Sequence, residues 1–466
     1  MKTPAVNAQR NEASSPIGLG EFVSLMAALT ALIALSIDML IPALPAIGLA
    51  LEVGRANDNQ LVIGVLFLGF GVGQLFYGPL SDSTGRKPAV YLGLGLYLIG
   101  CLLALLSQSL SMMLAGRLLQ GLGVAGPRTV TIALVRDKFE GRSMARVMSI
   151  IMTIFILVPI VAPALGQAVL SVASWRAIFG IYMAMAVVVG IWFGLRQDET
   201  LPEERRMPFT PARVIDAVRE VVRTRSALGY TLAAGCVFGA LLGYLNSVQQ
   251  ILQQQYGLGS RFPLYFGALA VSVGGASILN AALVMRYGMR LLSIWSIWTV
   301  LAMSVVFLGI ASVLGGHPPL WALMSYLMVS FFGIGLTFSN LNALAMHPLG
   351  HIAGTGAAVV GALSTLLSMV FGTAIGQAYN GTVLPLVAGF AILSALALVA
   401  MRWAARGHRM TPASGSALSP RRLFRMSVDT LSRLSAETTR GPVGLSAAEL
   451  EACPALAHSG IAPGLW

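Results

Sequence analysis

The 466-residue sequence predicts an all-α polytopic membrane protein, with twelve transmembrane helices in two halves of six and both termini cytoplasmic. Hydrophobic residues make up 56% of the chain and charged residues only 10%, whereas a soluble domain carries roughly 25% charged residues. Long apolar segments recur along the chain, and the positive charge gathers in alternate links between them. This composition excludes a soluble enzyme, a disordered chain and a disulfide scaffold.

A membrane-spanning helix needs about 20 predominantly apolar residues, because no unpaired backbone group is tolerated in hydrocarbon. The first predicted span, 22–47, is too long for a cleaved signal peptide and lacks a small-residue cleavage site, so we expect it to remain. The twelve predicted spans are 22–47, 61–80, 88–108, 110–135, 147–170, 176–195, 227–252, 262–285, 291–314, 320–345, 352–378 and 383–402.

The distribution of basic residues orients these spans. Of the 30 lysines and arginines, 25 precede span 1, follow span 12 or lie in links after even-numbered spans. The opposite side holds Arg55, Arg176 and Arg261. Because positive charge is retained on the cytoplasmic side, both termini are predicted to be cytoplasmic. The net charge of +12 therefore reflects topology, and we expect membrane lipid rather than nucleic acid as the partner of these residues.

The spans divide the chain into an N-terminal six-helix bundle (1–195), a cytoplasmic linker (196–226), a C-terminal six-helix bundle (227–402) and a basic, disordered cytoplasmic tail (403–466). Thr210-Pro211 predicts a helix start within the linker. An apolar stripe opposite basic residues then predicts an interfacial helix lying on anionic lipid; a solvated linker helix is the alternative.

Three ionisable residues lie at membrane depth, where charge is expensive and function is the first hypothesis: Asp38 in span 1, and Arg117 and Arg128 in span 4. At about 1.5 Å per residue, Asp38 and Arg117 lie at nearly the same depth. We therefore expect a buried ion pair, with a proton-coupling role or, alternatively, a purely structural one.

One face of span 4 is basic and polar. Arg117 and Arg128 are eleven residues apart, about three helical turns, so they share this face with Gln120, as expected beside a water-filled cavity. Arg128 either reads the substrate or pairs with carbonyls near the cytoplasmic mouth. The string Gly121-Leu-Gly123-Val-Ala-Gly126 matches a dinucleotide fingerprint, but no strand precedes it. Close helix packing explains these glycines better.

The remaining spans carry prolines and neutral polar groups. Span 5 contains Pro159, Pro163 and Gly166, and the two prolines predict a bend. Spans 7 to 12 contain no interior acid or base, so any proton chemistry is expected in the first half. The candidates for lining a cavity from the second half are Tyr244, Asn246 and Asn340.

The link between spans 2 and 3 reads Gly78-Pro-Leu-Ser-Asp82-Ser-Thr-Gly85-Arg86-Lys87. It resembles the signature loop of the major facilitator superfamily. Span 4 is similar to the superfamily's second motif and ends in Arg136-Asp137, and the Pro163–Gly166 segment resembles a degenerate antiporter motif. The surroundings of Asp38 resemble the bicyclomycin/chloramphenicol-resistance branch of the drug:proton antiporters.

The resemblance implies two six-helix bundles around a central cavity that opens alternately to each side, and proton-driven export. It assigns proton and substrate coupling to Asp38 with Arg117 beside it. It also implies that Asp82, Arg86 and Asp137 form a cytoplasmic gating latch. Ser83 replaces the usual basic residue of the loop, so we expect a weaker latch.

The predicted function is therefore proton-coupled efflux of small amphipathic compounds. Opening the cavity or binding a substrate would change the balance between burial and the Arg117 charge at Asp38, and so move a proton. One acid against two bases favours neutral, zwitterionic or anionic substrates over dications.

Export of an endogenous metabolite, with incidental drug transport, is an alternative. An intramembrane enzyme would need paired carboxylates, a Ser/His pair or a metal cluster at membrane depth, and none is present in the sequence.

No cofactor or metal is expected, and the partners are a small-molecule substrate and protons. The expected oligomeric state is a monomer. The expected location is a bacterial inner membrane, because 27 arginines against 3 lysines suggest a GC-rich bacterial genome.

Overall fold

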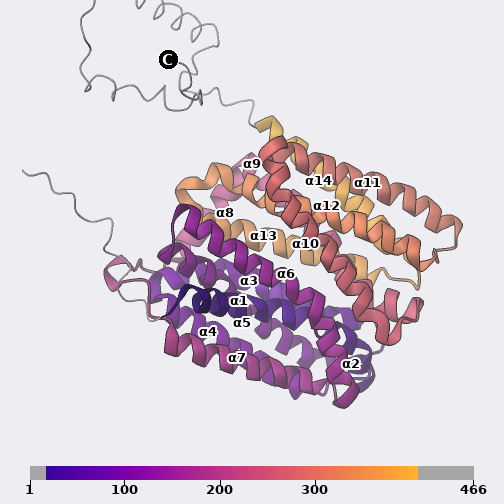
Figure 1. Cartoon of the computed structure of the whole chain (residues 1–466), viewed down its shortest axis with the longest axis horizontal. Helices are drawn as coiled ribbons and strands as arrows, with labels where there is room; N and C mark the ends of the chain where they lie inside the picture. Colours follow the sequence, from indigo (N-terminus) through magenta and orange to yellow (C-terminus); the bar gives the residue numbers. More distant parts are fainter. Residues whose placement is uncertain (1–16, 408–466) are drawn as a thin grey trace, which may run out of the picture. The chain divides into compact units, whose positions relative to one another are not determined.

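The computed structural model describes residues 17–407, and every regular element within that range is helical (Figure 1). Eleven stretches are long and apolar enough to cross a membrane. One of them, Leu320–Gln377, holds two helices joined by the turn η6 (His347–Ile352), so the predicted twelve spans are confirmed. The long helices are α1 (Leu19–Asp38), α3 (Leu61–Thr84), α4 (Arg86–Leu105), α5 (Leu110–Lys138), α6 (Gly141–Val172), α7 (Arg176–Arg196), α9 (Arg225–Val248), α10 (Phe262–Tyr287), α11 (Met289–Val313), α12 (Leu320–Met346), α13 (Ala353–Gln377) and α14 (Leu384–Gly407).

The sequence predicted one span over 22–47, but the structure breaks this span into several helices. Helix α1 ends at Asp38, and the short helices η1 (Ile41–Ala43) and α2 (Leu44–Ala50) complete the crossing. The reason is Pro42, whose ring would clash with the carbonyl of Asp38, four residues earlier, in an unbroken helix. The break places the only acid of the predicted membrane core at a helix end.

Glycines bring the helices of the first half into backbone contact. A Cβ at Gly121 of α5 would collide with the carbonyl of Leu66 in α3, and one at Gly123 would collide with the backbone of Tyr97 in α4. A Cβ at Gly126 would approach the Tyr77 ring to 2.6 Å. The packing interpretation of this glycine string is therefore confirmed.

The two halves, α1–α7 and α9–α14, meet along α3 and α13 and along α6 and α10 (Figure 1). The α3–α13 seam runs almost the full length of both helices. Near its outer end Gly64 packs on Thr373, and near its cytoplasmic end Gly78 lies against Ala358. Between them Gln74 donates a hydrogen bond of 3.3 Å to Thr365 Oγ1. This conformation therefore holds the halves together from one membrane face to the other.

Between the halves, the linker carries η3 (Glu203–Arg205) and α8 (Pro211–Arg223), which begins at the predicted Thr210-Pro211. Ala217 and Val221 are buried where α8 packs on α13 and α9, whereas Ile215 and Val222 are exposed. Part of the predicted lipid-facing stripe thus contacts protein instead. The predicted disordered tail lies outside the described residues, apart from its first few.

Candidate functional site

Asp38 lies at the C-terminal end of α1 and is 5% exposed. Within residues 17–407 its carboxylate has neither an ion pair nor a hydrogen bond. Its charge acts on Tyr182 in α7 and on Tyr244 in α9. A buried tyrosine from each half of the protein therefore lies near this acid.

Arg117 does not pair with Asp38, so the predicted direct ion pair is wrong for this conformation. Its Nη2 donates to the Ser36 carbonyl (2.9 Å), its Nε donates to the Val62 carbonyl (2.9 Å), and its Nη1 donates to Gln120 Oε1 (2.6 Å). The physical reason is the break in span 1, which releases carbonyls that need donors. A cation at a helix C-terminus is also favoured by the helix dipole.

Tyr182 acts on the same helix end. Its hydroxyl donates to the Leu35 carbonyl at 3.0 Å, one residue before the carbonyl that Arg117 binds. The Ser36 hydroxyl contacts the Tyr97 hydroxyl at 2.6 Å. The sequence analysis missed both tyrosines, because a tyrosine in an apolar helix carries no charge to draw attention to it. They form part of the buried polar support around the break.

Gln120, a predicted cavity residue, is fully engaged. It accepts from Arg117 and donates to Cys101 Sγ at 3.2 Å. It therefore positions Arg117 in this conformation and has no free group directed at a substrate.

Two of the second-half candidates have unsatisfied polar atoms. The hydroxyl of Tyr244 and both amide atoms of Asn246 are buried and have no hydrogen-bond partner among residues 17–407. The Tyr244 ring packs edge-on against Phe331, with centroids 4.7 Å apart. Because buried polar groups normally find partners, these orphaned atoms are groups to which a bound molecule could hydrogen-bond.

Asn340 lies apart from this group. Its amide pairs with Asn280 of α10 at 2.8 and 3.2 Å and also donates to the Leu336 carbonyl. The pair fastens α10 to α12 inside the second half.

The span-5 residues lie in α6, which runs through Pro159 and Pro163 as one helix. A Cβ at Gly166 would collide with the carbonyl of Met39, the residue after Asp38. The antiporter-like motif therefore brings α6 into backbone contact with the break in span 1, while the bend at the prolines stays a prediction.

Arg128 lies in α5 with its guanidinium 5.6 Å from the centroid of the Phe155 ring in α6. Its Nη1 is buried without a hydrogen-bond partner. The prediction that it pairs with carbonyls is not met in the described part of the chain.

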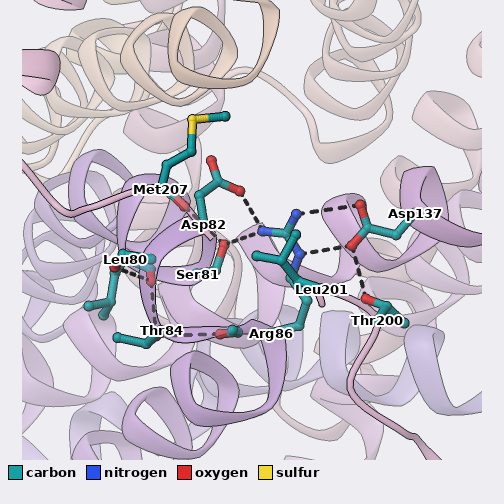
Figure 2. A network of polar contacts seen from close by, with 12 residues as sticks. Leu80, Ser81, Asp82, Thr84, Arg86, Asp137, Thr200, Leu201 and Met207 are labelled. Atoms are coloured by element: carbon teal, nitrogen blue, oxygen red, sulfur yellow. Dashed lines mark hydrogen bonds and ion pairs between the residues drawn. The ribbon is translucent and has the colours of Figure 1, made fainter. Parts of the chain in front are cut away.

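At the cytoplasmic end, the structure brings together Asp82, Arg86 and Asp137, which we call the latch (Figure 2). Arg86 Nη1 lies 2.6 Å from Asp82 Oδ1, and Arg86 Nε lies 2.8 Å from Asp137 Oδ2. Arg86 is 3% exposed, so both carboxylates are held against a buried cation. Gly85 adopts a φ of 103°, which glycine tolerates and which lets the chain turn between α3 and α4. Lys87 donates to the Gly194 carbonyl at 3.1 Å.

The start of the linker, residues 197–207, wraps over the latch, and the sequence analysis missed it. Glu199 accepts the backbone N–H groups of Arg86 and Lys87, both at 2.9 Å, and so caps the N-terminus of α4. Thr200 donates to Asp137 Oδ2 at 2.9 Å, and the Met207 N–H donates to the Asp82 carbonyl (Figure 2). An acid three residues after the end of α7 was the available signal.

At the outer end, amide side chains join the halves in what we call the amide seam: Asn57, Gln60, Gln250 and Gln377. Asn57 and Gln60 belong to the turn η2 (Ala56–Gln60), whereas Gln250 lies in the π-helical turn η4 (Gln249–Gln255). Gln60 donates to Gln250, which donates to Asn57 Oδ1 at 2.9 Å. Asn57 also exchanges backbone-directed bonds with Gln377, at 3.0 and 2.9 Å. The sequence indicated Gln377 only as one of several neutral amides in the second half, and it did not predict that these four residues meet, because single amides near span ends are common.

Comparison with known proteins places these features in a family. Residues 26–373 match the family described as the Major Facilitator Superfamily. The MFS-type transporter YdgK of Bacillus subtilis is 30% identical over 351 residues, which cover 73% of this chain and 85% of that protein. A bicyclomycin resistance protein homolog of Haemophilus influenzae is 26% identical over 382 residues, covering 78% of this chain and 91% of that protein.

Among solved structures, the human organic anion transporter MFSD10 superimposes with a TM-score of 0.61 at 17% identity, covering 83% of this chain and 100% of that one. A likeness at this identity concerns the fold alone. The family match extends over most of the chain and includes the latch loop, span 4, the first half from residue 26 and the second half up to residue 373. The chain therefore belongs to the Major Facilitator Superfamily of multi-pass membrane transporters.

Proposed function

We propose that the chain is a drug/proton antiporter of a bacterial inner membrane, which exports small amphipathic, neutral or zwitterionic compounds as a monomer by alternating access. The names of related proteins support the substrate class, since one of them is a bicyclomycin resistance protein homolog. The observation that carries the proposal is Asp38, a buried acid at the break of a membrane-spanning helix that has no cation partner within the described range.

Burial without a partner is a setting in which a carboxyl group exchanges a proton readily when its surroundings change, because the charged form depends on solvent or a nearby cation. Arg117 is close to Asp38 along the chain of contacts, because it donates to the carbonyl of Ser36, two residues before Asp38. Its other backbone bond goes to the carbonyl of Val62. Rearrangement of the α1 break would alter both the exposure of Asp38 and its separation from Arg117. Proton release and uptake would then follow the opening of each side.

Substrate would bind between the halves, opposite Asp38, where Tyr244 and Asn246 have unsatisfied polar atoms. The aromatic rings of Phe331 and Phe266 around Tyr244 would receive the apolar part of an amphipathic compound. The latch would stabilise the first half while the cytoplasmic side is closed.

The test is dye efflux from cells of an efflux-deficient bacterium, with and without an uncoupler. We expect the wild-type protein to export the dye only with a proton gradient, and Asp38→Asn to abolish this export while the protein remains in the membrane. Asp216→Asn is the matched control, because Asp216 lies on the exposed surface of α8 beside Arg219. Uncoupler-sensitive efflux by Asp38→Asn at the wild-type rate would refute the assignment.

A further inference from the structure

We propose that Arg128 binds the carboxylate of an amphipathic substrate on the cytoplasmic half of its path, so that the transporter prefers carboxylates and zwitterions to uncharged analogues. This inference rests on the proposed export function and names its substrate class. It starts from a cation in a membrane-spanning helix that has no acceptor in the described part of the chain.

Arg117 and Arg86, which are buried, differ in this respect from Arg128, which is half-buried. Arg117 donates to two carbonyls and an amide, and Arg86 donates to two carboxylates. Arg128 has one defined contact, its position above the Phe155 ring. A ring face attracts the cation but offers no lone pair to the N–H groups at the edge of the guanidinium. Its hydrogen-bonding edge is therefore left for a ligand.

The direction in which Arg128 faces follows from its neighbours. Helix α5 is covered by α3 and α4, whereas Arg128 contacts α6, which itself packs against α10 of the second half. Two turns further along α5, Arg136 reaches the second half, since a Cβ at Gly354 would lie 3.5 Å from its guanidinium. Between them Ile132 is 41% exposed. This side of α5 therefore faces the interface between the halves.

Depth and chemistry specify the ligand. Arg128 lies ten residues before the cytoplasmic end of α5, about 15 Å along the helix, and about 16 Å inward of Arg117. A substrate arriving from the cytoplasm would therefore pass Arg136, then Arg128, before it reached Asp38. The planar guanidinium matches a carboxylate with two parallel hydrogen bonds, and Phe155 supplies an apolar surface beside it.

Binding to purified protein in nanodiscs of zwitterionic lipid tests this inference. The probes are a dansyl-labelled medium-chain fatty acid and its methyl amide, which share fluorophore and chain but differ in charge. We expect wild-type protein to bind the acid more tightly than the amide. Arg128→Gln should weaken binding of the acid about tenfold or more while leaving that of the amide within about twofold, because bonds to charged groups are among the strongest.

Arg128→Lys should bind the acid with an affinity between those of wild type and Arg128→Gln, since an ammonium keeps the charge but not the paired geometry. The control is Arg142→Gln, which removes a charge from an exposed position at the cytoplasmic start of α6 and should change neither affinity. Amide binding also reports whether each variant is folded. Equal wild-type affinities for the two probes, or an equal loss of both in Arg128→Gln, would overturn the proposal.

Two further arms separate the remaining explanations. If phosphatidylglycerol in the nanodiscs displaces the acid from wild-type protein, Arg128 is a lipid headgroup site and the substrate assignment fails. Asp38→Asn should bind the acid as well as wild type does. The Arg128 site can therefore fail while proton-coupled dye export persists, and export can fail while the acid still binds.

Discussion

Tyr182 and Tyr244 are two buried tyrosines near the same acid, and their hydroxyls have opposite surroundings. The Tyr182 hydroxyl donates to the Leu35 carbonyl, whereas the Tyr244 hydroxyl has no partner in the part of the chain that the structure describes. A hydroxyl that bonds within the protein contributes to stability, and one that is buried without a partner costs stability. The contrast indicates that Tyr182 supports the end of α1 and that Tyr244 awaits a ligand.

Removing each hydroxyl tests this distinction. We expect Tyr182→Phe to lower the free energy of unfolding by about 1 kcal/mol, the usual net value of one hydrogen bond. Tyr244→Phe should leave it unchanged or raise it slightly, yet weaken substrate binding. Unfolding titrations in mixed detergent and dye-binding measurements on the same preparations check both. A loss of stability in Tyr244→Phe equal to that in Tyr182→Phe would contradict this assignment.

At the scale of elements, the break in span 1 and helix α6 form one unit. Gly166 lets the α6 backbone touch Met39, directly beside Asp38. Gly166→Ala should therefore push α6 away from the break and cost about 1–3 kcal/mol of stability, as overpacking does. Gly180→Ala is the matched control, because a Cβ at Gly180 of α7 would meet nothing within 4 Å. Thermal unfolding and efflux rates should both distinguish the two variants, and equal effects would argue against the α6 contact.

Sequence reasoning could identify these elements but not how they join. Hydropathy located the spans because burial in lipid demands long apolar helices. Charge at membrane depth pointed to Asp38 and Arg117 because a charged side chain is costly in lipid. Their direct pairing was inferred from depth alone, and depth takes no account of the carbonyls that the Pro42 break exposes to Arg117. The amide seam depends on contacts between distant segments, for which local pattern carries no signal, and the acid at Glu199 after the end of α7 does not by itself indicate that it caps α4.

At the scale of the whole molecule, different chemistry closes the two ends. The cytoplasmic end has the charged latch within the first half, whereas the outer end has neutral amides joining both halves. Neutral hydrogen bonds are weaker than charge-assisted ones, so the outer contact can separate at modest cost while the first half stays rigid. Alternating access predicts that the amide seam must separate during every transport cycle.

Tethering the seam therefore should stop transport. In a background in which Cys453, the third cysteine of the chain, is replaced by serine, Asn57→Cys with Gln377→Cys would place two half-buried thiols on η2 and at the end of α13, which contact each other across the halves. Joining them with a short bifunctional thiosulfonate should abolish dye efflux, and a reductant should restore it, because only the outer opening is blocked. Each of the two single substitutions, made in the same background and treated in the same way, should keep its efflux. Cys101 and Cys236 are buried and should not react. Undiminished efflux by the cross-linked double variant would show that this seam does not have to open, and alternating access through the outer end would be wrong.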